Sequence, residues 1–466
     1  MKTTSETKEL RSRKITLNKN ENVEESKKTT TQSGQRLHPF ESCHKIRDSL
    51  LSSASGYTNY RGILNLCVVL LVMSSSRLVL ENLLKYGFLV RFDVPILFIK
   101  DPTAWPSLLA LVLSNLFIIL ALYLEKLLQK SRIGENSGKF FCFMNVFTAL
   151  LVPAIYLWYR EANPVSSFFA LAWYTCLSMK LVSYFQVNRH CRLKIKNEPT
   201  LQENCKKAEK NSTNKIENNF LLEYPQNLNF KNLYYFMAAP TLCYELNFPR
   251  SQRIRKSFLI RRSSEIIFLS SLSLILLQQW VVPILKNSKI PFRESNILKI
   301  IERLLKLAVP NHVIWLIGFY CFFHSYLNVL AEVLRFGDRE FYRDWWNAED
   351  VNGFWQNWNI PVHKFCLRHI YKPLLSQGIT KAQASLIVFF VSAFFHEYLV
   401  SIPLRMFRIW AFLGMIVQIP FAIVVKKFLH GNYGNMAVWI SLIIGQPIAI
   451  MMYIHDYYID YFQVTN

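Results

Sequence analysis

Two adjacent ionisable residues inside an apolar segment are the strongest candidates for chemistry. His396 and Glu397 lie in the run Val391-Ser-Ala-Phe-Phe-His-Glu-Tyr-Leu-Val400. A charge at the centre of a membrane-spanning helix costs at least about 2.5 kcal/mol, so such residues normally face a polar cavity or a partner. The unperturbed pKa of histidine lies near neutrality, so His396 could take a proton from an alcohol, and Ser392 shares its helical face. The alternative, a histidine that only forms structural hydrogen bonds between helices, stays open.

A second candidate region is rich in aromatic residues mixed with polar ones. It comprises Phe341-Tyr-Arg-Asp-Trp-Trp-Asn347 and Trp355-Gln-Asn-Trp-Asn-Ile-Pro361. Trp and Tyr beside Arg, Asp and Asn suit the interface between a membrane and water. The region could grip a large amphipathic ligand by ring stacking and hydrogen bonds, or it could only anchor the chain at the membrane surface.

A cationic stripe follows directly. Lys364, Arg368 and Lys372 recur every four residues, while apolar residues occupy another arc. The spacing predicts a short interfacial helix with one positively charged face. This face could attract a phosphate-bearing ligand or anionic lipid headgroups, and the sequence leaves both possibilities open.

The elements that must position these residues are membrane spans. The chain has 466 residues, of which 52% are hydrophobic, and the apolar residues gather in nearly charge-free blocks of the length that a spanning helix needs. We therefore predict an all-α polytopic membrane protein with about nine spans: Gly62–Leu80, Trp105–Leu124, Phe140–Tyr159, Ser166–Phe185, Glu265–Leu285, Ala308–Leu334, Ala384–Pro403, Trp410–Val425 and Met436–Ile454.

The polar segments complete the organisation. Residues 1–61 are rich in Lys, Glu, Ser, Thr and Asn and predict a disordered cytosolic tail, followed by a nine-span domain over residues 62–466. The Lys and Arg bias predicts cytosolic loops at residues 186–264 and 335–383, a cytosolic N-terminus and a luminal C-terminus. The basic connector between Lys286 and Lys306 counts against this orientation.

Several functional classes find no support. The formal net charge is +23, but the basic residues lie between apolar blocks without any nucleic-acid-binding motif, so we expect no nucleic-acid partner. The nine cysteines form no C-x-x-C pair, and we expect neither a metal nor a cofactor. The sequence also contains no G-x-S-x-G elbow and no P-loop, so we expect no covalent enzyme intermediate.

The motifs resemble those of a known family. The run from Phe341 to Asn347 (Phe341, Tyr342, Arg343, Asp344, Trp345, Trp346 and Asn347) is similar to the signature of the membrane-bound O-acyltransferase superfamily, in its sterol and diacylglycerol acyltransferase branch. His396 resembles the catalytic histidine of that family. Within the branch, the chain closely resembles the animal diacylglycerol O-acyltransferases of the first kind. This resemblance is carried by the runs 240–250, 355–363, 395–401, 431–435 and 445–447.

The resemblance implies a fold of nine spans around an intramembrane reaction chamber, and roles for particular residues. His396 would be the general base, Glu397 would support it, and Asn359 would lie near the reacting carbonyl. The residues expected to contact acyl-CoA are Trp355, Gln356, Asn357, Trp358, Asn359, His363, Tyr371, Lys381 and Ser392. The residues expected to line the chamber are Met415, Gln418 and Gln446.

The resemblance also implies an activity, a place and an assembly. It implies acyl transfer from acyl-CoA to diacylglycerol, forming triacylglycerol, in the membrane of the endoplasmic reticulum, by a homodimer or homotetramer. Acyl transfer to a sterol, to retinol or to a fatty alcohol is the enzymatic alternative. A non-catalytic lipid-binding or transport protein is the alternative from another class, although the two halves show none of the symmetry of interrupted helices that is typical of transporters.

Overall fold

The structure is a computed structural model that describes residues 61–91, 93, 100–197, 222–293 and 297–464. The predicted tail, residues 1–61, lies outside the described residues except for Arg61, where the first helix begins. The chain divides into two compact units, Met1–Ser75 and Ser76–Asn466. Helix α2 (Arg61–Tyr86) crosses this boundary, and all other described elements belong to the second unit.

Helices dominate the part of the chain that the structure describes, and its β-type pairing is one isolated bridge between Arg250 and Phe336. The long helices after α2 are α4 (Trp105–Gln129), α5 (Glu135–Tyr159), α6 (Pro164–Asn197), α9 (Lys256–Leu276), α11 (Ile297–Phe319), α16 (Lys381–Leu404), α17 (Trp410–Phe428) and α18 (Asn432–Val464). The shorter ones are η2 (Pro102–Ala104), α8 (Phe230–Ala238), η3 (Leu277–Val281), α10 (Val282–Arg293), η4 (Tyr320–Tyr326), α12 (Leu327–Val333), η5 (Trp345–Asn347), α13 (Val351–Trp358), α14 (Ile360–Cys366), η6 (Leu367–Tyr371) and α15 (Lys372–Ser376).

Within the described ranges, nine helical stretches are long and apolar enough to cross a membrane. Each predicted span overlaps one of them, so the prediction of an all-α protein with nine spans is confirmed. The largest difference is at α6, which continues to Asn197 instead of ending near Phe185. The added turns are polar, but Arg192 is held by Glu125 of α4 and by Glu135 of α5, so the helix continues beyond its apolar part.

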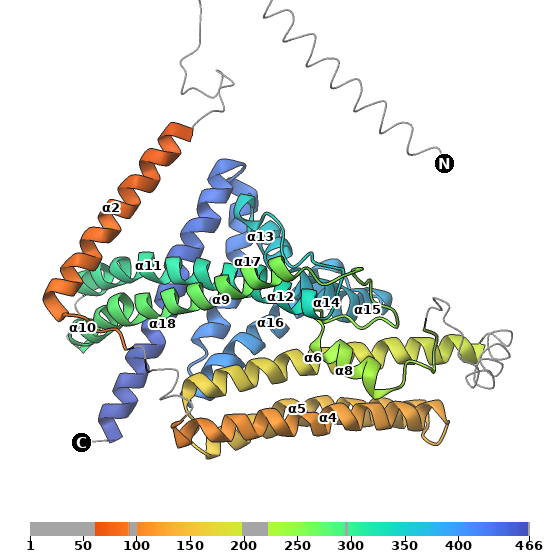
Figure 1. The fold of residues 1–466 in the computed structure, drawn as a ribbon. Helices are drawn as coiled ribbons and strands as arrows, with labels where there is room; N and C mark the ends of the chain where they lie inside the picture. Colours follow the sequence, from red (N-terminus) through yellow and green to blue (C-terminus); the bar gives the residue numbers. More distant parts are fainter. Residues whose placement is uncertain (1–60, 92, 94–99, 198–221, 294–296, 465–466) are drawn as a thin grey trace, which may run out of the picture. The chain divides into compact units, whose positions relative to one another are not determined.

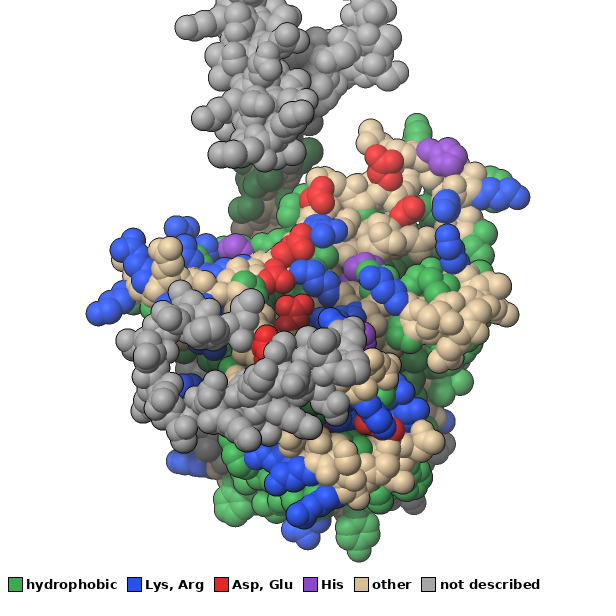
Figure 2. Space-filling view, turned by 90° about the vertical axis from the view of Figure 1, so that its right-hand side faces the viewer, with side chains coloured by type: hydrophobic (Ala, Val, Ile, Leu, Met, Phe, Trp, Pro, Cys, Tyr) green, Lys and Arg blue, Asp and Glu red, His purple; other side chains and the backbone are tan. Residues whose placement is uncertain are grey.

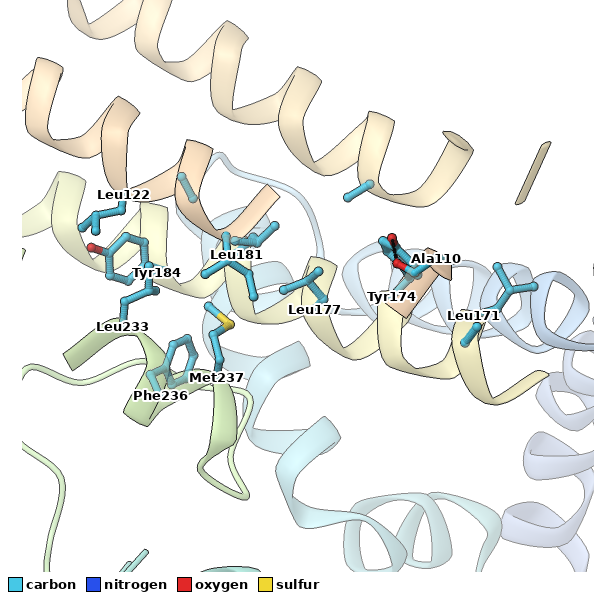
Figure 3. Packing of buried hydrophobic residues seen from close by; sticks show 14 of the residues in the cluster. Ala110, Leu122, Leu171, Tyr174, Leu177, Leu181, Tyr184, Leu233, Phe236 and Met237 are labelled. Carbon is cyan, nitrogen blue, oxygen red and sulfur yellow. Dashed lines mark hydrogen bonds between the residues drawn. The ribbon is translucent and has the colours of Figure 1, made fainter. Parts of the chain in front are cut away.

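Three of the long helices, α4, α5 and α6, lie side by side and enclose an extensive apolar core (Figure 1). Small residues such as Ala110, Ala149 and Ala170 are buried on their facing sides and let the backbones approach closely. Tyr174 of α6 is buried in this core, and its hydroxyl donates a 2.6 Å hydrogen bond to the Ala110 carbonyl oxygen of α4 (Figure 3). We call α4, α5 and α6 the three-helix bundle.

The short helix α8 packs against this bundle, inside a stretch that we expected to be a loop. Its residues Leu233, Phe236 and Met237 are buried in the core of the bundle (Figure 3). The end of α8 leaves carbonyl groups without helical partners. Lys180 of α6 satisfies them, because its buried ammonium group donates to the carbonyl oxygens of Phe236, Met237 and Ala239 at 2.8–3.0 Å.

The remaining long helices form a second set. Helix α16 packs against α17, α17 against α18, and α18 against α11, while α11 also contacts α9. Helix α16 additionally contacts α5 and α6, which joins this set to the three-helix bundle. Residues 334–380, between α12 and α16, contain the aromatic motif, and we call this segment the connector. It contributes α13 to α15, which lie near one another in the ribbon (Figure 1).

Candidate active site

Helix α16 presents His396 with one ring nitrogen already engaged. The helix starts with a capping box in which the Thr380 side chain accepts from the backbone N–H of Gln383 and the Gln383 side chain accepts in return. His396 Nδ1 lies 2.8 Å from the carbonyl oxygen of Ser392, one turn earlier. A carbonyl oxygen only accepts hydrogen bonds, so Nδ1 carries the proton and Nε2 keeps its lone pair. His396 is also exposed on the helix, so Nε2 is open to a ligand.

Glu397, the next residue, is buried and has a different set of partners. Its carboxylate accepts hydrogen bonds from the Ser401 hydroxyl, from the N–H groups of Ile409 and Phe412 at 3.0 Å each, and from the Tyr453 hydroxyl at 2.8 Å. Ile409 is the residue before α17, and its own side chain does not cap the helix. Glu397 therefore caps α17 with its carboxyl oxygens and links α16, α17 and α18 at one junction. None of these bonds reaches His396, so Glu397 has the geometry of a positioning residue, and its predicted catalytic support stays a prediction.

The aromatic motif is folded back on the segment that follows it. The N–H of Arg343 donates to the Asn357 carbonyl oxygen at 2.8 Å, and the N–H of Ile360 donates to the Phe341 carbonyl oxygen at 3.1 Å. Trp345 is buried, and its ring lies 5.0–5.7 Å from a surrounding set of rings, those of Trp315, Phe319, Phe354 and Trp439. The motif thus forms one packed aromatic unit with α11, α13 and α18.

Asn359 occupies the junction between α13 and α14. Its side-chain oxygen accepts from the N–H of Val362 at 3.2 Å and so caps α14. The amide Nδ2 has no hydrogen-bond acceptor among the described residues, so it is the donor group of this side chain that is open to a ligand. The predicted position of Asn359 near the reacting carbonyl stays a prediction.

The start of α18 is also fixed to the motif. Asn435 Nδ2 donates to the carbonyl oxygens of Trp346 and Ala348 at 3.0 and 2.8 Å. Gly434 passes so close to the Glu349 carbonyl oxygen that an added Cβ would lie 2.0 Å from it. The Gly431–Asn435 run therefore needs a glycine at position 434, because α18 and the connector approach each other closely there.

The residues predicted to contact acyl-CoA fall on two neighbouring groups of helices. Those from Trp355 to His363 lie on α13 and α14, and Tyr371 ends η6. Burial and the nearby charge of Arg343 lower the pKa of His363, which favours its neutral form. Lys381 and Ser392 lie on α16, which packs against η6. Gln356, Asn357 and Trp358 complete the predicted set on α13.

The predicted chamber residues lie on α17 and α18. Met415 is buried and Gln418 is half-buried on α17, which packs against α16. Gln446 of α18 accepts a 3.3 Å hydrogen bond from Nδ2 of Asn311. These residues therefore lie on helices around His396, and their lining of a chamber stays a prediction.

Comparison with known proteins agrees with this arrangement. The model of the membrane-bound O-acyltransferase family matches residues 134–455, which is more than half of the chain. The chain belongs to the membrane-bound O-acyltransferase family. The match includes the aromatic motif, Asn359 and the helix that carries His396.

Several relatives within this acyltransferase family are similar over nearly the whole chain. Diacylglycerol O-acyltransferase 1 of Bos taurus is 54% identical over 422 residues, covering 90% of this chain and 85% of the bovine protein. The protein of the same name from Homo sapiens is 54% identical over 419 residues, covering 90% of this chain and 84% of the human one. That of Corylus americana is 41% identical over 421 residues, covering 88% of this chain and 75% of the plant protein.

Two histidines, His324 and His312, were not among the site residues predicted from the sequence. His324 Nδ1 lies 2.7 Å from the hydroxyl of Tyr342, which ties the aromatic motif to the π-helical turn η4. His312 of α11 is buried between the rings of Trp315 and Trp439, and neither of its ring nitrogens has a hydrogen-bond partner among the described residues. The available signal was an ionisable residue within the predicted span Ala308–Leu334.

Proposed function

We propose that this protein is an acyl-CoA-dependent acyltransferase that esterifies the free hydroxyl group of diacylglycerol and forms triacylglycerol. The observation that carries the proposal is the geometry of His396: Nδ1 donates to the Ser392 carbonyl oxygen, and Nε2 remains a free base on the exposed side of α16. The likeness over 90% of the chain to proteins named diacylglycerol O-acyltransferase 1 supports this choice of acceptor.

The proposed reaction is a direct transfer. Nε2 of His396 accepts the proton of the acceptor hydroxyl while that oxygen attacks the thioester carbonyl carbon. The C–S bond of the thioester then breaks, and the leaving coenzyme A thiolate takes the proton back from the imidazolium. The ester and free coenzyme A are the products, the histidine returns to its starting state, and no covalent acyl-enzyme is required.

Two further residues support this chemistry. The free Nδ2–H of Asn359 would donate to the thioester carbonyl oxygen, on which negative charge develops during attack. Glu397 would keep α16 in register with α17 and α18, so that His396 keeps its orientation. In this account Asn359 acts on the substrate, whereas Glu397 acts through the position of the helix.

The location of these residues suggests two routes of entry. The donor would approach along α13 and α14, where the residues from Trp355 to His363 gather, and its acyl chain would reach a chamber beside Met415, Gln418 and Gln446. Diacylglycerol would enter from the bilayer. We also propose a homodimer or homotetramer in the membrane of the endoplasmic reticulum, with a cytosolic N-terminus and a luminal C-terminus.

The test is an acyl-transfer assay with membranes that carry the protein. Labelled oleoyl-CoA is supplied with diacylglycerol and, in parallel, with cholesterol, retinol or a fatty alcohol. We expect labelled triacylglycerol as the main product. If the only product is an ester of another alcohol, that alcohol is the acceptor in place of diacylglycerol. If folded protein forms no ester, a non-catalytic lipid-binding protein is favoured.

A further inference from the structure

A pocket of about 490 Å³ lies beside the cationic stripe of the connector. One wall comes from the segment between α8 and α9, a second from the segment that follows α12, and a third from α14, η6 and α15. The lining combines an apolar part, namely Cys243, Phe248, Pro249, Phe336 and Leu367, with a polar part, namely Thr241, Glu245, Asp338, Lys364, Arg368 and Lys372. A volume of this size is typical of pockets that hold small molecules.

The three cations Lys364, Arg368 and Lys372 point to an anionic ligand. They line the pocket together with two carboxylates, which leaves an excess of positive charge. Lys372 has no carboxylate partner among the described residues. Figure 2 shows the face of the molecule on which α14 and α15 lie, where Lys and Arg side chains are interspersed with Asp and Glu.

The ion pairs that are already present do not block such a ligand. Lys364 lies 3.0 Å from Asp338 and 3.4 Å from Glu340, and Arg368 lies 3.4 Å from Glu245. All of these side chains are between 41 and 53% exposed. Exposed ion pairs contribute only about 0–1 kcal/mol. A phosphate group offers several charged oxygens and can therefore replace the carboxylates.

One buried hydroxyl group links the wall between α8 and α9 to the wall that includes η6. Ser183 of α6 is fully buried, and its Oγ accepts a 2.7 Å hydrogen bond from the N–H of Tyr244, which lies between Cys243 and Glu245. The same Oγ lies 2.8 Å from Nε2 of His369, the neighbour of Arg368. His369 Nδ1 donates to the Gln186 oxygen at 2.7 Å, so Nε2 is free to accept from Ser183.

We propose that this pocket binds the phosphate group of an amphiphilic ligand. The phosphate would contact Arg368 and Lys372 with support from Lys364, and the apolar part of the ligand would cover Phe248 and Leu367. The phosphate can come from coenzyme A or from the headgroup of an anionic phospholipid. With coenzyme A as the source the proposal rests on the proposed function, whereas with a phospholipid it does not.

Cys243 provides a probe of the pocket itself, independent of activity. It is free, half-buried and part of the lining. Burial raises the pKa of its thiol, so alkylation with iodoacetamide is best followed at alkaline pH, with mass spectrometry as the readout. The full-length protein is labelled in neutral micelles alone, with coenzyme A, or with phosphatidic acid. Cys191, which is half-buried on the polar end of α6 and outside the pocket lining, serves as the internal control.

We expect at least one of the two phosphate compounds to slow the labelling of Cys243 by fivefold or more and to leave the labelling of Cys191 unaffected. Protection by coenzyme A alone assigns the pocket to the donor substrate, and protection by phosphatidic acid alone assigns it to a lipid headgroup. If neither compound slows the labelling of Cys243, the proposal is wrong.

Two matched variants complete the test. In the first, Lys364, Arg368 and Lys372 are all replaced by Gln. In the second, Lys130, which directly follows α4, and Lys426 and Lys427 of α17 are replaced by Gln, which removes the same charge from exposed positions. We expect protection to be lost in the first variant and kept in the second. Equal protection in both would overturn the assignment of the cations. If the parent protein forms no triacylglycerol while the phosphate compounds still protect Cys243, the proposed function is wrong and the proposal of a phosphate-binding pocket is unaffected.

Discussion

The three-helix bundle (α4, α5 and α6) and the set that carries the candidate site (α16, α17 and α18) are built on different principles. In the bundle, between 33 and 56% of the residues in each apolar span are buried, against 17–28% in α16 to α18. The bundle has an extensive apolar core, whereas α16 to α18 have a smaller apolar cluster, which includes Val425 and Val438, and are also joined by the polar contacts of Glu397. The difference indicates that stability is concentrated in the bundle, and that the site keeps exposed helix surface for lipids and substrates.

The largest expected effect comes from Glu397, because this residue joins α16 to α17 and α18 and directly follows His396. Replacing Glu397 with Ala leaves four donors without this acceptor, of which the Ser401 and Tyr453 hydroxyls are buried, and each buried unsatisfied group costs about 1–3 kcal/mol. We expect a marked fall in Tm together with loss of acyl transfer per folded molecule. Thermal unfolding in detergent and the assay with diacylglycerol measure both.

Glu397→Gln is the matched variant, because it keeps one acceptor oxygen and the shape of the side chain. We expect it to lie between the parent and Glu397→Ala in both Tm and rate. An Ala variant with the stability of the parent would show that the polar junction does not hold these helices together.

A deletion in the bundle should affect stability alone. Leu171 is fully buried, so Leu171→Ala should destabilise the protein by about 2–5 kcal/mol through lost burial and a cavity. The rate per folded molecule should stay within twofold of the parent. Leu113→Ala, on the exposed side of α4, is the control and should leave Tm nearly unchanged. A large loss of rate per folded molecule in Leu171→Ala would contradict the separation of the two regions.

His369 connects the bundle to the connector and makes this contact sensitive to pH. Burial, and to a smaller extent the charge of Arg368, lower the pKa of His369 to about 4, against about 6.5 in an unfolded chain. Because the pKa is lower in the folded state, neutral His369 contributes its full stability above about pH 6.5, and this contribution is lost as the pH falls toward 4.

The measurement is Tm as a function of pH for the parent and for His369→Gln. We expect the variant to be less stable at neutral pH, because its bonds with Ser183 and Gln186 are altered, and to lose less stability between pH 6.5 and 4. Parallel curves for the two proteins would show that His369 does not titrate in this range.

The smallest effect is expected from a single hydroxyl group in the bundle. Tyr174→Phe removes the hydrogen bond to the Ala110 carbonyl oxygen and keeps the aromatic packing. We expect a loss of about 1 kcal/mol in stability and no change in rate. A loss above about 3 kcal/mol would mean that polar contacts matter in the bundle as they do around Glu397.

Local sequence patterns predicted the features that depend on neighbours in the chain. Nine spans follow from the length and apolarity of each segment. The capping box at Thr380 is also local, because it joins Thr380 to Gln383, but it was identified only in the structure. The family follows from contiguous motifs. His396 could be singled out because an ionisable pair in an apolar span is conspicuous.

Contacts between distant residues could not be predicted in this way. The partners of Glu397 include Phe412 and Tyr453, which belong to other helices. Lys180 lies inside a predicted span, and its role became visible only when α8 packed against α6. Each of these interactions depends on the tertiary packing of helices, which the periodicity of a single segment does not encode.

The most direct test of the proposed function is the rate of triacylglycerol formation per folded molecule in the parent and in His396→Ala, with labelled oleoyl-CoA and diacylglycerol. The side chain is exposed and its recorded hydrogen bond is to its own helix, so the variant should keep the Tm and the assembly of the parent. A general base contributes about 10²–10⁴-fold, so we predict a loss of that size. A folded His396→Ala variant that keeps most of the parental rate would contradict the assignment of His396 as the base.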